Sequence, residues 1–149
     1  MKRSPELQPL SRDHHRALYA ALRLRRADAE TAAGAADGFL DFWREHGQRH
    51  FEIEEQLLLP AFVRGGGDAR DEVVARVLMD HVEIRARARS LDASSSLEEF
   101  HQLGELLADH VRIEEDKLFP LVERTLDSGA LTTLGVEVER AESRGTPTS

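Results

Sequence analysis

The segment HVRIEEDKLFP, residues 110–120, places a histidine, two adjacent glutamates and a proline in an otherwise leucine-rich part of the chain. HFEIEEQLLLP, residues 50–60, repeats it sixty residues earlier, and six of the eleven positions are identical. The repeat extends upstream, because an Asp-His dipeptide at 13–14 precedes the first copy as one at 80–81 precedes the second. The opening histidine is separated from the later one by 36 residues in the first half and 29 in the second. The chain therefore consists of two similar halves.

Each half predicts two long helices, because apolar residues recur at helical spacing between short breakers, and nothing in the chain predicts a strand. Ser11 is a good N-cap for the first helix, and Ser96 with Glu99 forms a capping-box pattern for the fourth. Pro60 and Pro120 should kink or end their helices, because proline removes a backbone donor. The expected helices cover residues 11–30, 38–64, 68–91 and 96–126, with a small-residue linker around Gly34.

Two helical hairpins with short links predict an all-α fold, an up-down-up-down four-helix bundle over about residues 10–127. The 149 residues are most naturally one domain, 1–149, large enough for a core without disulfides. Segment 131–142 predicts a short C-terminal fifth helix, and 143–149 a disordered tail. The apolar face of the fifth helix either covers the bundle or forms a homodimer contact, and the pattern leaves both open. Its residues are Leu131, Leu134 and Val138.

Composition narrows the kinds of site and partner. The chain has no cysteine, so any metal must be held by nitrogen and oxygen ligands. A net charge of -8 opposes binding to nucleic acid or an anionic membrane surface. The N-terminus lacks the apolar core of a signal peptide, and no stretch approaches the roughly eighteen apolar residues of a membrane helix. We therefore expect a cytoplasmic protein whose partners are small ligands or proteins.

Each predicted helix carries one histidine on its apolar stripe, and the second and fourth also carry a glutamate four residues after it. Residues four apart lie on the same face, about 5–6 Å apart between Cβ atoms, so both side chains point to the core. His14 is chosen over His15 because the repeat aligns it with His81, and the next position is turned by about 100°. The inward residues are His14, His50, Glu54, His81, His110 and Glu114.

Four imidazoles and two carboxylates make an unfavourable core by themselves, because an unpaired buried carboxylate costs free energy or stays protonated. A pair of divalent metal ions removes the conflict, since the two glutamates can bridge both ions. The pattern therefore predicts a two-metal site, and the alternative is a metal-free structural network. Imidazole and carboxylate suit Fe, Mn or Zn alike and disfavour calcium.

Several polar residues beside this set have open roles. Glu55 and Glu115 lie at the edge of the stripe and either contact metal or stay solvated. His46 precedes His50 by four residues and is either a ligand or a hydrogen-bonding neighbour. Asp13 and Asp80 are candidate acceptors of a hydrogen bond from a ligand histidine. For Asp13 a position near a helix N-terminus, where a carboxylate is favourable, is an equal explanation. Two histidines are predicted to lie on the surface: His15 and His101.

These residues resemble the hemerythrin-like, or HHE cation-binding, family over about residues 10–127. The shared pattern is an inward histidine on the first and third helices and His-x-x-x-Glu on the second and fourth. The resemblance implies a four-helix bundle with a non-haem di-iron centre, bridged by two carboxylates and an oxo or hydroxo group. It implies His14 and His50 on one iron, His81 and His110 on the other, and Glu54 and Glu114 as bridges.

The chain departs from the oxygen carriers of that family at two positions. Their third helix has a second histidine where this chain has Arg85, and their fourth helix has aspartate where this chain has Glu115. It is more similar to the hemerythrin-like domains of iron-centre repair proteins and of iron and oxygen sensors. The resemblance implies a di-iron protein that binds or senses O2 or NO, or reports iron status. The alternatives are an enzyme acting on peroxide or in iron-cluster repair, and iron storage or delivery.

Overall fold

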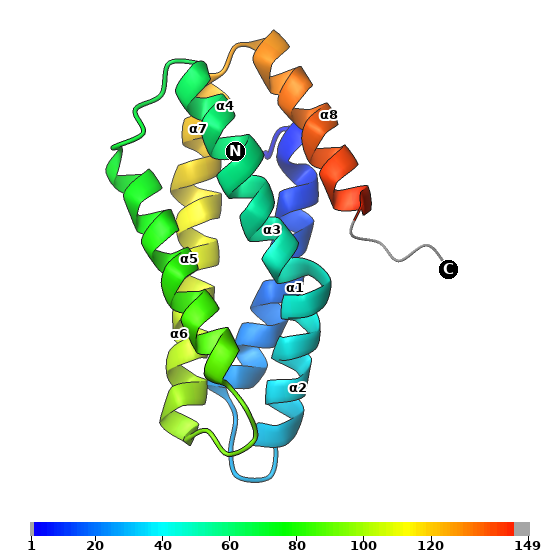
Figure 1. Ribbon diagram of the computed structural model, residues 1–149, viewed down its shortest axis with the longest axis vertical. Coiled ribbons are helices and arrows are strands. Elements are labelled where there is room, and N and C mark those ends of the chain that lie inside the picture. The colour runs from blue at the N-terminus through cyan, green and yellow to red at the C-terminus, as the bar shows by residue number, and fades with distance from the viewer. Residues whose placement is uncertain (1, 145–149) are drawn as a thin grey trace.

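The protein folds as a bundle of helices, and the computed structural model describes residues 2–144, among which there is no strand (Figure 1). The all-α four-helix bundle predicted from the sequence is confirmed. In chain order the elements are the 3-10 turn η1 (Pro5–Leu7), α1 (Gln8–Arg25), α2 (Ala32–Phe42), the π turn η2 (Trp43–Gly47), α3 (Gln48–Ile53), the π turn η3 (Glu54–Leu58), α4 (Leu59–Arg64), α5 (Glu72–Ser90), α6 (Leu97–Ile113), the π turn η4 (Glu114–Leu118), α7 (Phe119–Thr125) and α8 (Ser128–Arg144).

Two of the four bundle helices are long rods assembled from several segments. The segments α2 to α4 follow one another without a break, as do α6 to α7, because π turns join them. Neither Pro60 nor Pro120 ends its helix, so ending, one of the two outcomes predicted for them, is wrong. Each follows a π turn, in which Leu59 N–H bonds to Glu54 O and Phe119 N–H to Glu114 O. The wider turn lets the helix continue past a residue that has no backbone donor.

The first helix begins earlier than predicted, at Gln8 rather than after Ser11. Proline is tolerated in a first turn, and Pro9 occupies it. The Ser11 hydroxyl donates instead to Glu115 Oε2 at 2.7 Å. The linker predicted around Gly34 is also wrong, because Gly34 lies inside α2 and the connecting loop covers 26–31.

The starts of the third and fourth bundle helices follow their capping side chains. Asp71 accepts a hydrogen bond from the Val73 N–H, so α5 begins at Glu72 and not at Asp68. Ser96 accepts a hydrogen bond from the Glu99 N–H at 3.1 Å, and the predicted cap of α6 is confirmed.

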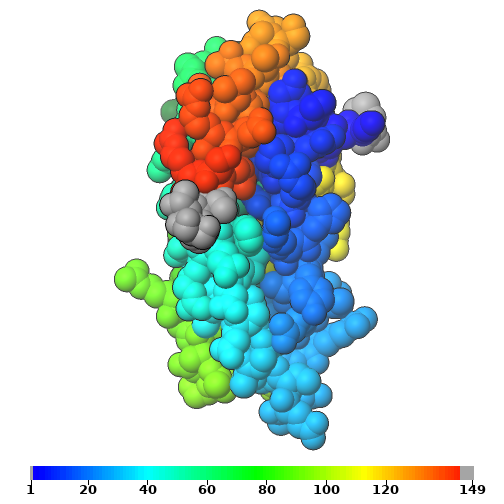
Figure 2. All heavy atoms as spheres, turned by 90° about the vertical axis from the view of Figure 1, so that its right-hand side faces the viewer, coloured from blue at the N-terminus to red at the C-terminus, as the bar shows by residue number. Residues whose placement is uncertain are grey.

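The C-terminal helix is longer than predicted. It spans Ser128–Arg144 instead of 131–142, because the helix continues through Ser143, whose hydroxyl donates to Glu139 O at 3.0 Å. The first two residues of the expected disordered tail are thus helical, and 145–149 lie outside the described residues. Helix α8 lies across one end of the bundle, beside the N-terminal segment (Figure 2).

The apolar face of α8 covers the bundle, because Leu134 and Val138 are fully buried against the apolar cluster at that end. The homodimer contact stays a prediction. No helix among residues 2–144 has the length and apolar character needed to cross a membrane. The cytoplasmic location also stays a prediction.

Buried apolar side chains form two separate clusters, and a polar layer lies between them. One cluster joins the ends of α1, α5 and α6 nearest α2, with Phe39 and Phe100 at its centre. The other joins η1, α4, α7 and α8 and includes Phe62 and Phe119. Helices α1 and α6 approach closely at Gly104, where a Cβ atom would come within 2.8 Å of the Ala21 carbonyl oxygen. This packing holds the polar layer rigidly from both ends.

Candidate metal centre

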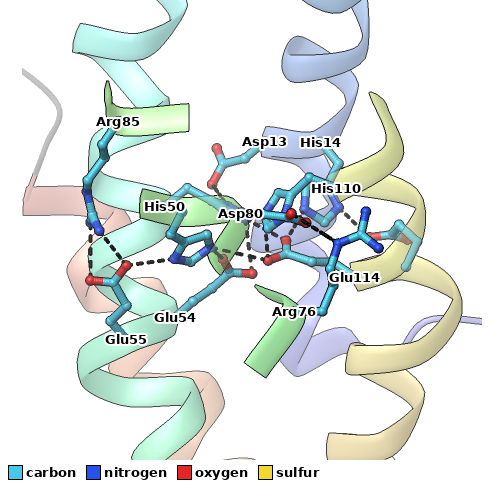
Figure 3. A network of polar contacts seen from close by, with 12 residues as sticks. Asp13, His14, His50, Glu54, Glu55, Arg76, Asp80, Arg85, His110 and Glu114 are labelled. Carbon is cyan, nitrogen blue, oxygen red and sulfur yellow. Dashed lines mark hydrogen bonds and ion pairs between the residues drawn. The ribbon is translucent and has the colours of Figure 1, made fainter. Parts of the chain in front are cut away.

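The six residues predicted to point inward meet in one buried layer of the bundle. Figure 3 labels all of them except His81. They come from all four bundle helices, with the two glutamates at the first positions of the π turns η3 and η4. None of the six is more than 4% exposed. The repeat in the sequence therefore becomes a single shared cluster in space.

The cluster divides into two groups of four, and within each group the candidate ligand atoms lie within 4.8 Å of one another. His14 and His50 form one group with Glu54 and Glu114. His81 and His110 form the other with the same two glutamates. Each group has two histidines of its own, and both groups share the two glutamates, so each group could hold a cation.

The histidine Nε2 atoms face the glutamate oxygens at short range. The distances are 2.7 Å from His14 to Glu114 Oε1, 3.2 Å from His50 to Glu54 Oε2, 3.0 Å from His81 to Glu54 Oε1 and 3.0 Å from His110 to Glu114 Oε2. Neutral imidazole can present only a lone pair at Nε2 when its proton is on Nδ1. The facing atoms are then all acceptors, and a cation between them turns repulsion into attraction.

Each histidine has a carboxylate on its other nitrogen, which fixes that proton on Nδ1. The acceptors are Glu115 for His14 at 2.7 Å, Asp13 for His50 at 3.0 Å, Glu55 for His81 at 2.6 Å and Asp80 for His110 at 3.0 Å. All four Nε2 atoms therefore face the two shared glutamates.

Unpartnered buried atoms test whether the residues fit a metal. Both carboxylate oxygens of Glu54 lack a hydrogen bond of good geometry, as do His81 Nε2, His110 Nε2 and Glu114 Oε2, despite the short distances between them. Buried polar atoms are seldom left this way, because each costs free energy. Their convergence at the shared centre is the arrangement that two cations with nitrogen and oxygen ligands would satisfy.

The charges in the layer are mutually dependent. Burial alone would lower the pKa of His81 and His110, but Glu114 and Glu54 raise them to about 9 and about 10. Burial alone would raise the pKa of Glu114, but contacts with His110 and His14 hold it well below its usual range. The histidines therefore retain protons in this arrangement, and a cation that bound among them would displace those protons.

A comparison with known families agrees with this geometry. Residues 9–122 match the family described as the hemerythrin HHE cation binding domain. The chain belongs to this family. No curated protein and no solved structure gives a further match. The resemblance stated from the sequence is confirmed, and this HHE-domain protein has a buried histidine and glutamate cluster suited to metal binding.

The structure separates the open alternatives around the cluster of the HHE domain. Glu55 and Glu115 are in neither metal group and act as hydrogen-bond acceptors for His81 and His14. Asp13 and Asp80 accept from His50 and His110, which is one of the roles predicted for them. Each aspartate thus serves the histidine of its own half, whereas each of these glutamates serves the other half. That the six inner residues bind metal stays a prediction.

The remaining histidines of the HHE domain lie outside the cluster. His46 belongs to neither group; its Nδ1 is 3.4 Å from Arg49 Nη2, one turn of helix away from His50. His15 is exposed, as predicted. His101 is half-buried, and its Nε2 donates to the Ala27 carbonyl at 2.8 Å, so it joins α6 to the first loop instead of lying free on the surface.

Sequence reasoning missed one carboxylate at the edge of the centre. Glu142 of α8 comes within 4.8 Å of Asp13 and His50, measured between their ligand-type atoms. Burial and the adjacent Asp13 carboxylate raise the pKa of Glu142 to about 8. No signal in the repeat could have found it, because α8 lies outside both repeated halves.

Aromatic rings close the sides of the cluster. Phe51 stacks on His81 with ring centroids 3.8 Å apart, and Phe119 stacks on His14 at 5.3 Å. These rings restrict the rotation of the two imidazoles and keep water from their faces. The sequence placed both phenylalanines in the helices but did not indicate these contacts.

Proposed function

We propose that this protein is a non-haem di-iron protein that binds or senses a small diatomic molecule, O2 or NO, at a carboxylate-bridged site. The observation that carries the proposal is the pair of four-residue groups sharing Glu54 and Glu114. Membership of a cation-binding family supports the same conclusion. Iron bound there would supply one-electron redox chemistry and open coordination positions for a small ligand.

The residues of the chain would perform three separate tasks. The four Nε2 atoms and the two glutamates would hold the ions. The four carboxylates on Nδ1 would keep each imidazole in the tautomer and orientation needed for binding. The apolar clusters on either side exclude bulk water and strengthen every charge interaction in the layer.

Enclosure favours a very small ligand over a large substrate. The six inner residues are between 0 and 4% exposed, and Phe51 and Phe119 cover two of the imidazoles. A diatomic molecule or a peroxide can enter such a layer through small fluctuations of the bundle, whereas a larger substrate requires helices to separate. Binding or sensing of a gas therefore suits the closed geometry.

The test is metal analysis of the purified protein, with absorption spectra recorded after reduction and then after exposure to O2, NO or hydrogen peroxide. We expect about two irons per chain, ferric near-ultraviolet absorption that bleaches on reduction, and a new spectrum with O2 or NO. Catalytic consumption of peroxide would instead indicate an enzyme, and iron release on mild reduction would indicate storage. Absence of iron after reconstitution would refute the proposal.

A further inference from the structure

The two halves of the centre differ in the arginines around their histidines. In the half of the centre formed by His81 and His110, Arg85 Nη1 and Nη2 lie 2.7 and 3.2 Å from the two oxygens of Glu55 (Figure 3). Glu55 is the hydrogen-bond acceptor for His81. Arg76 Nε lies 3.0 and 3.2 Å from the two oxygens of Asp80. Both carboxylates that orient the histidines of this half are therefore directly paired with a guanidinium.

The first half has no such direct pairing among the described residues. The guanidinium that approaches Asp13 is that of Arg16, at 3.7 Å, and the additional carboxylate of Glu142 lies beside it. Glu115 has the Ser11 hydroxyl at 2.7 Å. Arg3 is 3.6 Å from Glu115 and makes its shorter ion pair, 2.9 Å, with Glu123.

The internal repeat shows where this difference arises in the chain. Arg85 follows His81 by four residues, and the equivalent position after His14 is Leu18, which is 43% exposed. Arg76 precedes His81 by five residues, and the equivalent position before His14 is Pro9. The two arginines are thus specific to the second half.

A guanidinium bonded to a carboxylate draws negative charge from the oxygen that accepts the histidine N–H. The imidazole is then less electron-rich and binds a cation less strongly. The positive charge of the arginine also repels the ion, and this is the smaller effect because solvent screens the Arg85 and Arg76 side chains, which are 39% and 46% exposed. Both effects act on His81 and His110, and neither acts as strongly on His14 and His50.

Resting on the proposed di-iron function, we propose that the two metal positions are unequal, with the ion at His81 and His110 bound more weakly and released first. Arg85 and Arg76 act through Glu55 and Asp80 and are positioning residues. The protein therefore has one retained ion and one exchangeable ion.

Stepwise metal release tests this proposal. The protein is loaded anaerobically with Fe(II) to two ions per chain and mixed with excess of a chelator that becomes coloured on binding Fe(II). We expect two release phases of equal amplitude whose rates differ by about tenfold or more. The readout is independent of any activity of the loaded protein.

Exchanging the residues at equivalent positions of the two repeats shows which pair of histidines gives each release phase. Arg85→Leu should slow the fast phase by about tenfold, and Leu18→Arg should accelerate the slow phase by a similar factor. The matched controls are Arg89→Leu, an exposed arginine one turn from Arg85, and Leu22→Arg, one turn from Leu18. Neither control should change either phase.

Three outcomes would overturn the proposal. Release of two ions in a single phase would show equal positions. Acceleration of the fast phase by Arg85→Leu would show that the arginine strengthens binding by holding Glu55 in place. Fewer than two ions per loaded chain would refute the di-iron function as well, which separates that failure from the first two.

Discussion

The polar layer and the two apolar clusters beside it differ in whether their buried atoms need a partner. Phe39, Phe100 and Phe119 are fully buried in the clusters and need no hydrogen-bond partner. In contrast, each buried polar or charged residue of the described chain lies in the layer, and several of its atoms are unpartnered. The clusters therefore hold the fold together, and the layer has a free-energy cost that a bound cation would offset.

Removal of a bridging carboxylate tests the strongest form of this contrast. Glu114→Ala should abolish binding of both ions, because Glu114 belongs to both metal groups. The variant should also lose the stabilisation from binding, about 4 kcal/mol for each ion at a free concentration 1,000 times its Kd. Elemental analysis and thermal unfolding with and without a chelator measure both effects. Glu105→Ala, at an exposed position on α6, is the control, and two ions retained by Glu114→Ala would contradict the assignment.

A large truncation in an apolar cluster should produce the opposite pattern. Phe100→Ala should lower the free energy of unfolding by about 3–5 kcal/mol, because it leaves a cavity among fully buried side chains. The loss should be similar with and without metal, and two ions should still bind at saturating metal. Denaturant unfolding of both forms checks this expectation, with Tyr19→Ala as the exposed aromatic control. A loss confined to the metal-loaded form would mean that the cluster and the layer are not separate.

Alkaline pH should destabilise the metal-free layer without affecting the clusters. The pKa of His81 is raised to about 9 and that of His110 to about 10, against an ordinary value of 6.5. Their protonation therefore stabilises the metal-free fold fully below about pH 6.5 and progressively less as pH rises through 9 to 10, by on the order of 3–5 kcal/mol for each histidine. Metal affinity should rise over the same range, because the imidazoles must lose their protons to bind.

Unfolding of the chelator-treated protein at several pH values, together with metal titrations, measures these two trends. Glu54→Gln should flatten the alkaline loss of stability, since Glu54 helps to raise the pKa of both histidines. A metal-free protein whose stability is constant between pH 6.5 and 10 would contradict the charge assignment.

The smallest expected effect lies at the edge of the layer. Asp80→Asn should weaken metal binding by about 10–100-fold, or about 1.4–2.7 kcal/mol, because an amide is a poorer acceptor for the His110 N–H. Two ions should still bind at high metal concentration. Competition with a chelator measures the change, and Asp109→Asn, whose side chain is exposed and paired with Arg112, is the control. Complete loss of both ions would place Asp80 among the ligands themselves.

The inward histidines and glutamates could be predicted because helical periodicity and the repeat are both written in the order of residues. Apolar neighbours at three and four residues place His110 and Glu114 on one face regardless of how the helices later pack. The same information identified Asp13 and Asp80 as candidate hydrogen-bond acceptors. The order of residues within one helix was therefore enough to predict those residues whose position depends on that helix alone.

Contacts between helices could not be predicted in this way. The bonds from His14 to Glu115 and from His81 to Glu55 cross from one half to the other and depend on the register of packed helices. The π turns also escaped prediction, because the residue types that form them are ordinary in α-helices. Glu142 reaches His50 only because α8 docks on the bundle.

The π turn at Glu54–Leu58 recurs at the same place in the second copy, Glu114–Leu118. The one-residue expansion thus stands immediately after the fourth position of the helix turn that begins at His50 in one copy and at His110 in the other, so it places both glutamates in the same way. Each metal group contains one glutamate from each copy, Glu54 and Glu114. Neither copy alone could therefore supply both glutamates of a metal group, whereas Arg76 and Arg85 both belong to the second copy.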